Sequence, residues 1–202
     1  MESKTELRRR LRRARAALDP VQRRHAQKRA NQALKPLIKR GKRIGAYWAA
    51  GSELDVHDFI VTAQQRGARV YLPYIAPRGK RLWFTPYPQA NARPERTRAR
   101  LPRIPQFAGR KIRAERLQLL LLPLVGIDRN GTRLGQGGGF YDATLSTFAR
   151  SGCVPRSVGV GFACQICPPM PAQTHDQGVQ GFVCEHGYTR LGSGKNPSYP
   201  FP

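Results

Sequence analysis

The spacing of apolar residues and a capping signal predict two helices at the start of the chain. Within residues 3–18, leucine and alanine recur four, three and four positions apart, which is the period of an amphipathic helix. Asp19 and Pro20 follow, and an N-cap residue with proline at the first helical position indicates a second helix that reaches about Leu34. We therefore expect an N-terminal helical segment over residues 1–40.

Short apolar runs predict a series of strands further along the chain. Leu117–Val125 is largely apolar, as is typical of a strand buried on both faces of a parallel sheet. Strands that alternate with helices favour an α/β fold, so we expect a three-layer αβα architecture with a mostly parallel sheet and the N-terminal helices packed on it. Strands are expected at 43–49, 68–73, 81–87, 117–125, 157–163 and 181–184, with helices at 55–66 and 140–150.

The same pattern suggests how the chain is divided. Its 202 residues suit one domain, which is expected to span residues 1–186. Residues 88–116 are rich in arginine and proline and are expected to be irregular. Residues 187–202 carry glycine, serine, proline and asparagine, so we expect a disordered tail there.

Positive charge points to anionic partners. The chain has 36 Lys and Arg against 12 Asp and Glu, a formal net charge of +24. The arginine run within residues 8–15 can bind nucleic acid or a polyanionic small molecule, and it is also typical of a solvated helix face. The hydrophobic fraction of 40% excludes a wholly disordered chain. The sequence has no membrane-length apolar run and no secretory signal, so we expect a cytoplasmic protein without membrane contact.

The cysteines leave two interpretations. Cys164 and Cys167 have the spacing of half a zinc site or of a redox pair. No second pair follows at the usual distance, so buried, reduced thiols near the end of a strand are the favoured interpretation.

A glycine-rich loop carries the strongest chemical signal. It follows the apolar run, precedes a predicted helix and has glycine at 135, 137, 138 and 139. Without Cβ atoms, backbone N–H groups can approach an anion closely, and Arg133 adds guanidinium donors for phosphate. Asp142 is a natural magnesium ligand beside such a phosphate. Neither the Walker pattern nor the dinucleotide pattern fits, so a simple structural turn remains an alternative.

The glycine-rich loop and several other segments resemble a known family. Segment 131–142, which reads G-x-R-L-G-x-G-x-G-x-Y-D, resembles the signature of the 5-formyltetrahydrofolate cyclo-ligases, also called methenyltetrahydrofolate synthetases. Residues 4–8 resemble the family's opening Lys-x-x-x-Arg at the ATP site. Glu53 matches a folate-binding glutamate, and Asp176 matches an aspartate near the metal. The chain departs from the family at Gln180, where an acidic residue is usual.

The resemblance implies an ATP- and magnesium-dependent ligase. It would cyclise 5-formyltetrahydrofolate to 5,10-methenyltetrahydrofolate through an iminium phosphate, with release of ADP and phosphate. The basic surface suits a polyglutamylated folate, and a monomer is expected. Catalytic roles fall to Arg133 and Lys4; ATP contacts to Lys4, Arg8, Arg133, Leu134, Gly135, Gln136, Gly137, Gly138, Gly139, Phe140 and Tyr141; substrate contacts to Glu53, Trp48, Phe84, Gly137 and Tyr141; and metal contacts to Asp142 and Asp176.

Two other functions stay open at this stage. A nucleic-acid-binding protein would explain the net charge and the arginine run, but it leaves the glycine loop unexplained, so nucleic acid is not the expected partner. Another phosphate-ligand enzyme on a similar sheet would share the glycine loop, since a fold does not fix a function. That enzyme would have no use for the Lys4-to-Arg8 opening.

Overall fold

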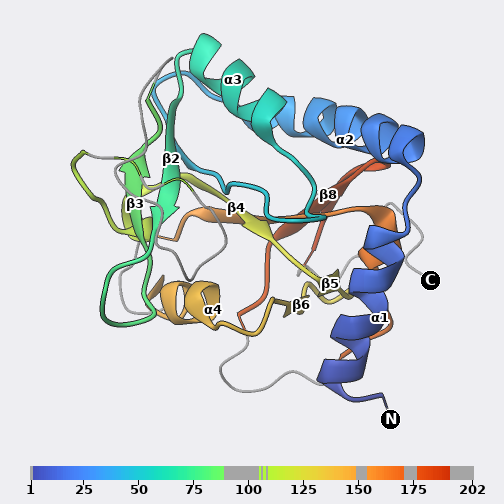
Figure 1. Ribbon diagram of the computed structural model, residues 1–202. Helices are drawn as coiled ribbons and strands as arrows, with labels where there is room; N and C mark the ends of the chain where they lie inside the picture. The colour runs from blue at the N-terminus through green and yellow to red at the C-terminus, as the bar shows by residue number, and fades with distance from the viewer. Residues whose placement is uncertain are drawn as a thin grey trace.

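A seven-stranded sheet forms the centre of the protein (Figure 1). The computed structural model describes residues 2–88, 105, 107, 109–148, 154–170 and 177–191. The strand order is β3-β2-β1-β4-β7-β8-β9. The five central strands are parallel, and the two edge strands β3 and β9 run antiparallel to their neighbours. The strands are β1 (Arg43–Gly45), β2 (Arg69–Tyr74), β3 (Trp83–Pro86), β4 (Leu119–Pro123), β7 (Arg156–Val160), β8 (Gly181–Cys184) and β9 (Gly187–Arg190).

Helices cover both faces of this sheet, which confirms the predicted α/β class. Helices α2 (Pro20–Leu34) and α3 (His57–Gln65) lie along one face, and α4 (Phe140–Leu145) lies on the other (Figure 1). Alternate strand residues supply the two cores: Leu119 and Leu121 face α2 and α3, whereas Leu120 and Leu122 face α4. Because β4 is central and buried on both faces, its sequence is almost wholly apolar.

The first helix differs from the expectation that both N-terminal helices pack on the sheet. Helix α1 (Lys4–Ala16) packs instead against a short two-stranded sheet of β5 (Gly126–Ile127) and β6 (Arg133–Leu134). Leu7 and Leu11 share a small core there with residues that include Val125 and Leu134. The amphipathic spacing correctly predicts the helix, but it does not say which surface the apolar stripe meets.

The helix starts follow their capping residues. Ser3 and Glu6 form a capping box at α1, in which the Glu6 N–H donates to Ser3 Oγ at 3.2 Å and the Ser3 N–H donates to Glu6 Oε2 at 2.8 Å. Asp19 caps α2, and its carboxylate accepts from the Val21 N–H at 2.8 Å. The predicted N-cap of the second helix is therefore confirmed.

Two further expectations need correction. Residues 187–190, expected within a disordered tail, form strand β9, which pairs with β8 from Gly181↔Arg190 to Cys184↔Gly187. Strands β8 and β9 are joined by a turn of two residues, Glu185 and His186. So short a turn does not stand out in the pattern of apolar and polar residues. The expected irregular excursion lies partly outside the described residues. Its described end holds a 3₁₀ turn, Ala114–Arg116, and a bridge between Phe84 and Ile112.

Candidate functional site

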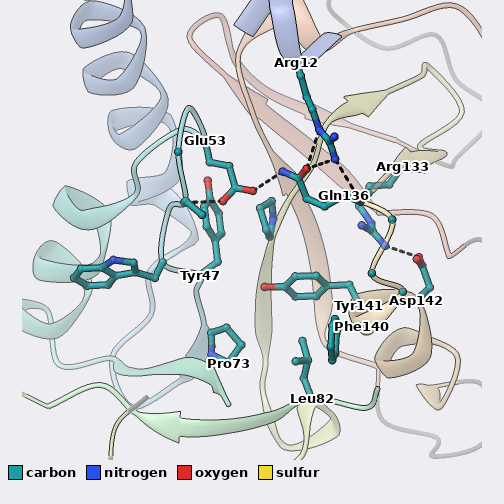
Figure 2. Close-up of a pocket in the computed structure, with 18 of the residues that line it drawn as sticks. Arg12, Tyr47, Glu53, Pro73, Leu82, Arg133, Gln136, Phe140, Tyr141 and Asp142 are labelled. Atoms are coloured by element: carbon teal, nitrogen blue, oxygen red, sulfur yellow. Dashed lines mark hydrogen bonds and ion pairs between the residues drawn. The ribbon is translucent and has the colours of Figure 1, made fainter. Parts of the chain in front are cut away.

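A cavity of about 680 Å³ opens where the central parallel strands end (Figure 2). Tyr47 and Trp48 follow β1, Pro73 lies near the end of β2, and Pro123 ends β4. Ligands collect at this edge in open α/β sheets, because the loops that leave the strands surround it. The cavity has two chemically different walls, the glycine loop (residues 135–139) on one side and residues 50–53 on the other.

The glycine loop adopts backbone conformations that other residues rarely take. Gly137 has φ +100° and Gly139 has φ +70°. A Cβ built on Gly137 meets no atom within 4 Å, so the space beside this backbone is open. A Cβ on Gly135 would lie 2.8 Å from Nη1 of Arg133. Glycine at 135 therefore leaves room for the arginine, and glycine at 137 permits the turn.

Arg133 and Asp142 form an ion pair at the wall beside the loop (Figure 2). The Arg133 side chain is only 2% exposed, whereas that of Asp142 is 27% exposed. Arg133 Nε is buried and has no hydrogen-bond partner among the described residues. The guanidinium carbon also lies 5.9 Å from the centre of the Tyr141 ring. A buried cation with an unused donor is suited to receive an anion.

A hydrogen-bonded chain joins the two walls. The Glu53 carboxylate, 8% exposed as a residue, accepts from the side-chain Nε2 of Gln136 at 2.9 Å and from the Ala50 N–H at 3.0 Å. Gln136 in turn accepts at Oε1 from Arg12 Nη2 at 2.7 Å. Figure 2 shows this chain crossing the cavity from Glu53 to Arg12. Gln136 thus ties the glycine loop both to the acidic wall and to α1.

Helix α1 presents a row of arginines to the site. Arg8 Nε donates to the Gly135 carbonyl at 3.0 Å, and Arg15 Nε donates to Ser52 Oγ at 3.0 Å. Burial lowers the pKa of Arg15, which is 4% exposed, and the charge of Glu53 partly offsets this effect. Arg8, Arg12 and Arg15 are four and three residues apart and so share a helix face. That spacing could have marked Arg12 and Arg15 as site residues, but sequence reasoning assigned neither.

Two tyrosines stay protonated in the cavity wall. The Tyr47 hydroxyl donates to the Leu54 carbonyl at 2.6 Å. Burial raises the pKa of Tyr47 and of Tyr141, and the negative charge of Glu53 raises both further. Figure 2 shows the Tyr141 ring extending from the first turn of α4 into the cavity. Both phenols therefore offer neutral hydroxyl groups at neutral pH.

Most of the predicted site residues converge on this cavity. The glycine loop, Arg133, Tyr141 and Asp142 form one wall together with Phe140, and Glu53 and Trp48 stand on the other. Sequence reasoning missed Leu82, which lines the cavity and whose backbone N–H donates to Thr144 Oγ1 at 2.9 Å. The lining residues are Arg12, Arg15, Ala16, Tyr47, Trp48, Ala50, Gly51, Ser52, Glu53, Pro73, Ile75, Leu82, Pro123, Arg133, Gly135, Gln136, Gly137, Gly138, Gly139, Phe140, Tyr141 and Asp142.

Other predicted residues lie elsewhere. Phe84, expected against the substrate, is fully buried in the core between the sheet and α4 and does not line the cavity. Leu134 faces the core under α1. Lys4 and Arg8 are on α1 but do not line the cavity, although Arg8 reaches the loop backbone. Asp176 lies outside the described residues.

The cysteines match the interpretation as buried thiols. Cys167 and Cys184 are buried and Cys164 is half-buried, and all three are free. Burial raises the pKa of Cys167 and of Cys184 to about 11, so both are thiols at neutral pH. Among the described residues, no group of three or more His, Cys, Asp or Glu side chains could hold a metal ion. In the same part of the chain, no helix is long and apolar enough to cross a membrane.

Fold and site together define an α/β protein with a cationic glycine-loop cavity at the carboxyl ends of its parallel strands. The model of the 5-formyltetrahydrofolate cyclo-ligase family matches residues 1–185. The chain therefore belongs to this family, and it is an enzyme of the ligase type.

Two bacterial cyclo-ligases are similar to this chain in sequence. The chain is 30% identical to the 5-formyltetrahydrofolate cyclo-ligase of Escherichia coli K12 over 170 residues, which is 82% of this chain and 91% of the relative. It is 28% identical to the Haemophilus influenzae cyclo-ligase over 179 residues, 87% of this chain and 94% of the relative.

Solved structures share the fold. Aquifex aeolicus 5,10-methenyltetrahydrofolate synthetase superposes with a TM-score of 0.78 at 23% identity, covering 97% of this chain and 96% of that one. The Mycoplasma pneumoniae 5,10-methenyltetrahydrofolate synthetase gives 0.71 at 21% identity, covering 91% and 99%.

Proposed function

We propose that the protein uses ATP and magnesium to cyclise 5-formyltetrahydrofolate to 5,10-methenyltetrahydrofolate, with release of ADP and phosphate. The observation that carries the proposal is one cavity that has a cationic glycine loop on one side and a buried carboxylate on the other. In this proposal the glycine loop and Arg133 hold the triphosphate, and the wall around Glu53 holds the folate. Family membership supports the substrate.

The glycine-loop wall fits a phosphate chain. Arg133 has a buried Nε with no partner among the described residues. A Cβ built on Gly137 would meet no atom within 4 Å, so the space beside this backbone is open. Backbone N–H groups in such a loop can approach phosphate oxygens closely. Arg8 and Lys4 would add positive charge from α1, one helical turn apart, with Arg8 already bonded to the loop at the Gly135 carbonyl.

The opposite wall fits a reduced pterin. Glu53 is buried and accepts one hydrogen bond from the Gln136 side chain and one from the Ala50 N–H, and a carboxylate has further acceptor positions for the N–H edge of the ring. Trp48 and Tyr141 line the same cavity and offer aromatic surface to the ring. The excess of basic residues would suit a polyglutamylated tail, which is a polyanion.

The carboxylate of Asp142 fits a magnesium ion in one specific way. Magnesium in phosphoryl-transfer sites is held by one or two carboxylates together with substrate phosphates, so a single aspartate is sufficient from the protein. Asp142 is 27% exposed at the cavity and is held by Arg133. When bound there, magnesium would neutralise charge on the phosphate oxygens. Asp176 is proposed as a further ligand on the resemblance alone.

The chemistry needs activation of an amide. The formyl oxygen on N5 is a poor leaving group, and transfer of the γ-phosphoryl group to it gives an iminium phosphate. N10 then attacks the formyl carbon, the ring closes, and phosphate leaves. In this scheme Arg133 stabilises negative charge as the phosphoryl group moves, and the Glu53 wall aligns the pterin.

A direct assay tests the proposal. The protein is mixed with 5-formyltetrahydrofolate with and without Mg-ATP, and the absorbance of the methenyl product is followed. We expect product only with Mg-ATP. Gly137→Val should abolish ATP binding in calorimetry while the circular dichroism spectrum stays native, because the side chain enters the open space and strains φ. Absence of product with folded wild-type protein would refute the proposed reaction.

A further inference from the structure

A second cleft lies apart from the catalytic cavity. It has a volume of about 740 Å³ and shares none of its lining residues with the first cavity. Its wall combines the 3₁₀ turn Ala114–Arg116 with residues just before β3 and at or before the starts of β1, β4 and β7. The lining residues are Arg43, Arg81, Arg113, Glu115, Arg116, Leu117, Gln118 and Val154.

Positive charge dominates this cleft. Four arginines and one glutamate line it, which leaves a formal charge of +3. The single carboxylate, Glu115, is already committed, because it pairs with Arg81 and accepts from Thr147 Oγ1 at 2.7 Å. The charges of Arg43, Arg113 and Arg116 are therefore not neutralised by any carboxylate that lines the cleft.

Several side chains in the cleft are held in place before any ligand arrives. The Arg113 guanidinium carbon lies 3.4 Å from the centre of the Trp83 ring, so the cation rests directly against the face of the indole. The Arg81 Nε is a buried donor without a hydrogen-bond partner among the described residues, whereas the equally unpartnered Glu115 Oε2 is an acceptor and does not favour an anion. Burial lowers the pKa of Arg113, and the positive charge of Arg81 lowers it further. Such a cluster gains free energy when an anion enters it.

We propose that this cleft is a second binding site, independent of the catalytic cavity, for a small oxyanion that carries two or more negative charges. A guanidinium fork pairs equally well with phosphate and carboxylate oxygens, so the ligand is either a phosphorylated compound or a polycarboxylate. The stacked Arg113 and the half-buried Arg43 contact the anion from two sides of the cleft, while Arg81 remains paired with Glu115.

Trp83 provides a direct signal for binding. The chain has two tryptophans, and Trp48 lines the catalytic cavity. In a Trp48→Phe background, Trp83 is the single tryptophan, and its stacked contact with Arg113 makes its emission sensitive to a ligand in the cleft. Tripolyphosphate and citrate are titrated separately at constant ionic strength, and the assay needs neither ATP nor folate. Its outcome therefore does not depend on the proposed reaction.

Charge-matched variants distinguish binding in the cleft from non-specific electrostatic attraction to the positively charged protein. Arg113→Gln and Arg43→Gln each remove one positive charge from the cleft, and Arg43→Gln leaves the stack on Trp83 intact. Arg24→Gln removes the same charge from an exposed position of α2 that lines neither cavity. Native circular dichroism spectra verify that each variant is folded.

We expect a saturable change in Trp83 emission with at least one of the two anions. The anion that saturates identifies the source, and either one supports the site. Each cleft variant should raise the apparent Kd at least tenfold, and Arg24→Gln should change the apparent Kd less than twofold. No saturation with either anion would overturn the proposal, as would equal losses in Arg43→Gln and Arg24→Gln.

Discussion

Arg133 illustrates how the fold positions a single side chain at the candidate site. Arg133 is the first residue of β6, and its side chain is 2% exposed. It forms an ion pair with Asp142, which lies in the first turn of α4. The pair holds the guanidinium at the cavity wall while Nε stays without a partner in the described part of the chain. We expect the charge of this guanidinium to stabilise a phosphate in the cavity while the ion pair stays intact.

Truncation of Arg133 should therefore reduce catalysis more than stability. For Arg133→Ala we expect kcat/KM to fall about 10²–10³-fold, the loss usual for one electrostatic donor in a transition state. Steady-state kinetics and thermal unfolding are measured together. For thermal unfolding alone, the double variant Arg133→Ala with Asp142→Ala shows how much of any loss of stability comes from the aspartate that the single variant leaves unpaired. A kcat/KM within threefold of wild type would exclude Arg133 from the reaction.

Glu53 offers a test of the folate wall. Glu53→Gln keeps the size of the side chain but replaces one acceptor with a donor. An unpaired pterin donor costs about 1–3 kcal/mol, so calorimetry should give folate binding roughly 5- to 150-fold weaker, with ATP binding nearly unchanged.

A swapped pair is the control for the Glu53 prediction. Because Glu53 also accepts from Gln136, the variant combining Glu53→Gln with Gln136→Glu can restore that contact without restoring the charge at position 53. Folate affinity should remain low in the swapped pair. Its full recovery would mean that the carboxylate acts only on Gln136.

At the scale of elements, α1 forms part of the site. Its core contacts dock it on β5 and β6, and its Arg8 and Arg12 side chains reach the glycine loop, Arg12 from the cavity wall. Arg12 Nη2 donates to the Gln136 backbone carbonyl at 3.0 Å as well as to its side chain. We infer that α1 holds the loop in its binding conformation.

Arg12→Ala tests this function of α1. Hydrogen bonds of this kind contribute about 0.5–1.5 kcal/mol, so the Kd for ATP should rise about 2- to 12-fold. Arg9→Ala is the matched control, because Arg9 is exposed on the same helix and does not line the catalytic cavity. Equal effects of the two substitutions on ATP affinity would assign the change to lost charge rather than to loop contact.

At the scale of the whole molecule, few carboxylates oppose a large positive charge. Glu115 joins the 3₁₀ turn to Arg81 and Thr147. Burial alone would raise the pKa of Glu115, but the hydrogen bonds from Thr147 and from its own backbone, together with Arg81, outweigh burial and lower the pKa below 4.5. Folding therefore favours the ionised form of this group.

The stability that Glu115 contributes should depend on pH. A carboxyl group with a lowered folded-state pKa stabilises the fold above its unfolded value, and this stability is lost as the pH falls through the folded-state pKa. Urea unfolding should make Glu115→Gln less stable than wild type at pH 7, and the difference should shrink below about pH 4.5. A difference that does not change with pH would contradict the assigned role of the charge.

The sequence by itself determined the parts of the fold that rest on local patterns. Apolar spacing predicted α1, a continuous apolar run predicted β4, and the capping residue Asp19 followed by Pro20 predicted the start of α2. The glycine loop was visible because glycine spacing is a property of the chain and not of its surroundings.

Only the tertiary structure decided which residues meet. Strand β9 exists because β8 provides a partner, and Phe84 is buried because α4 covers its face of the sheet. The link from Arg12 through Gln136 to Glu53 joins positions that are far apart in the chain. Local periodicity specifies which face of an element is apolar, but the partner of that face depends on the packing of the whole chain.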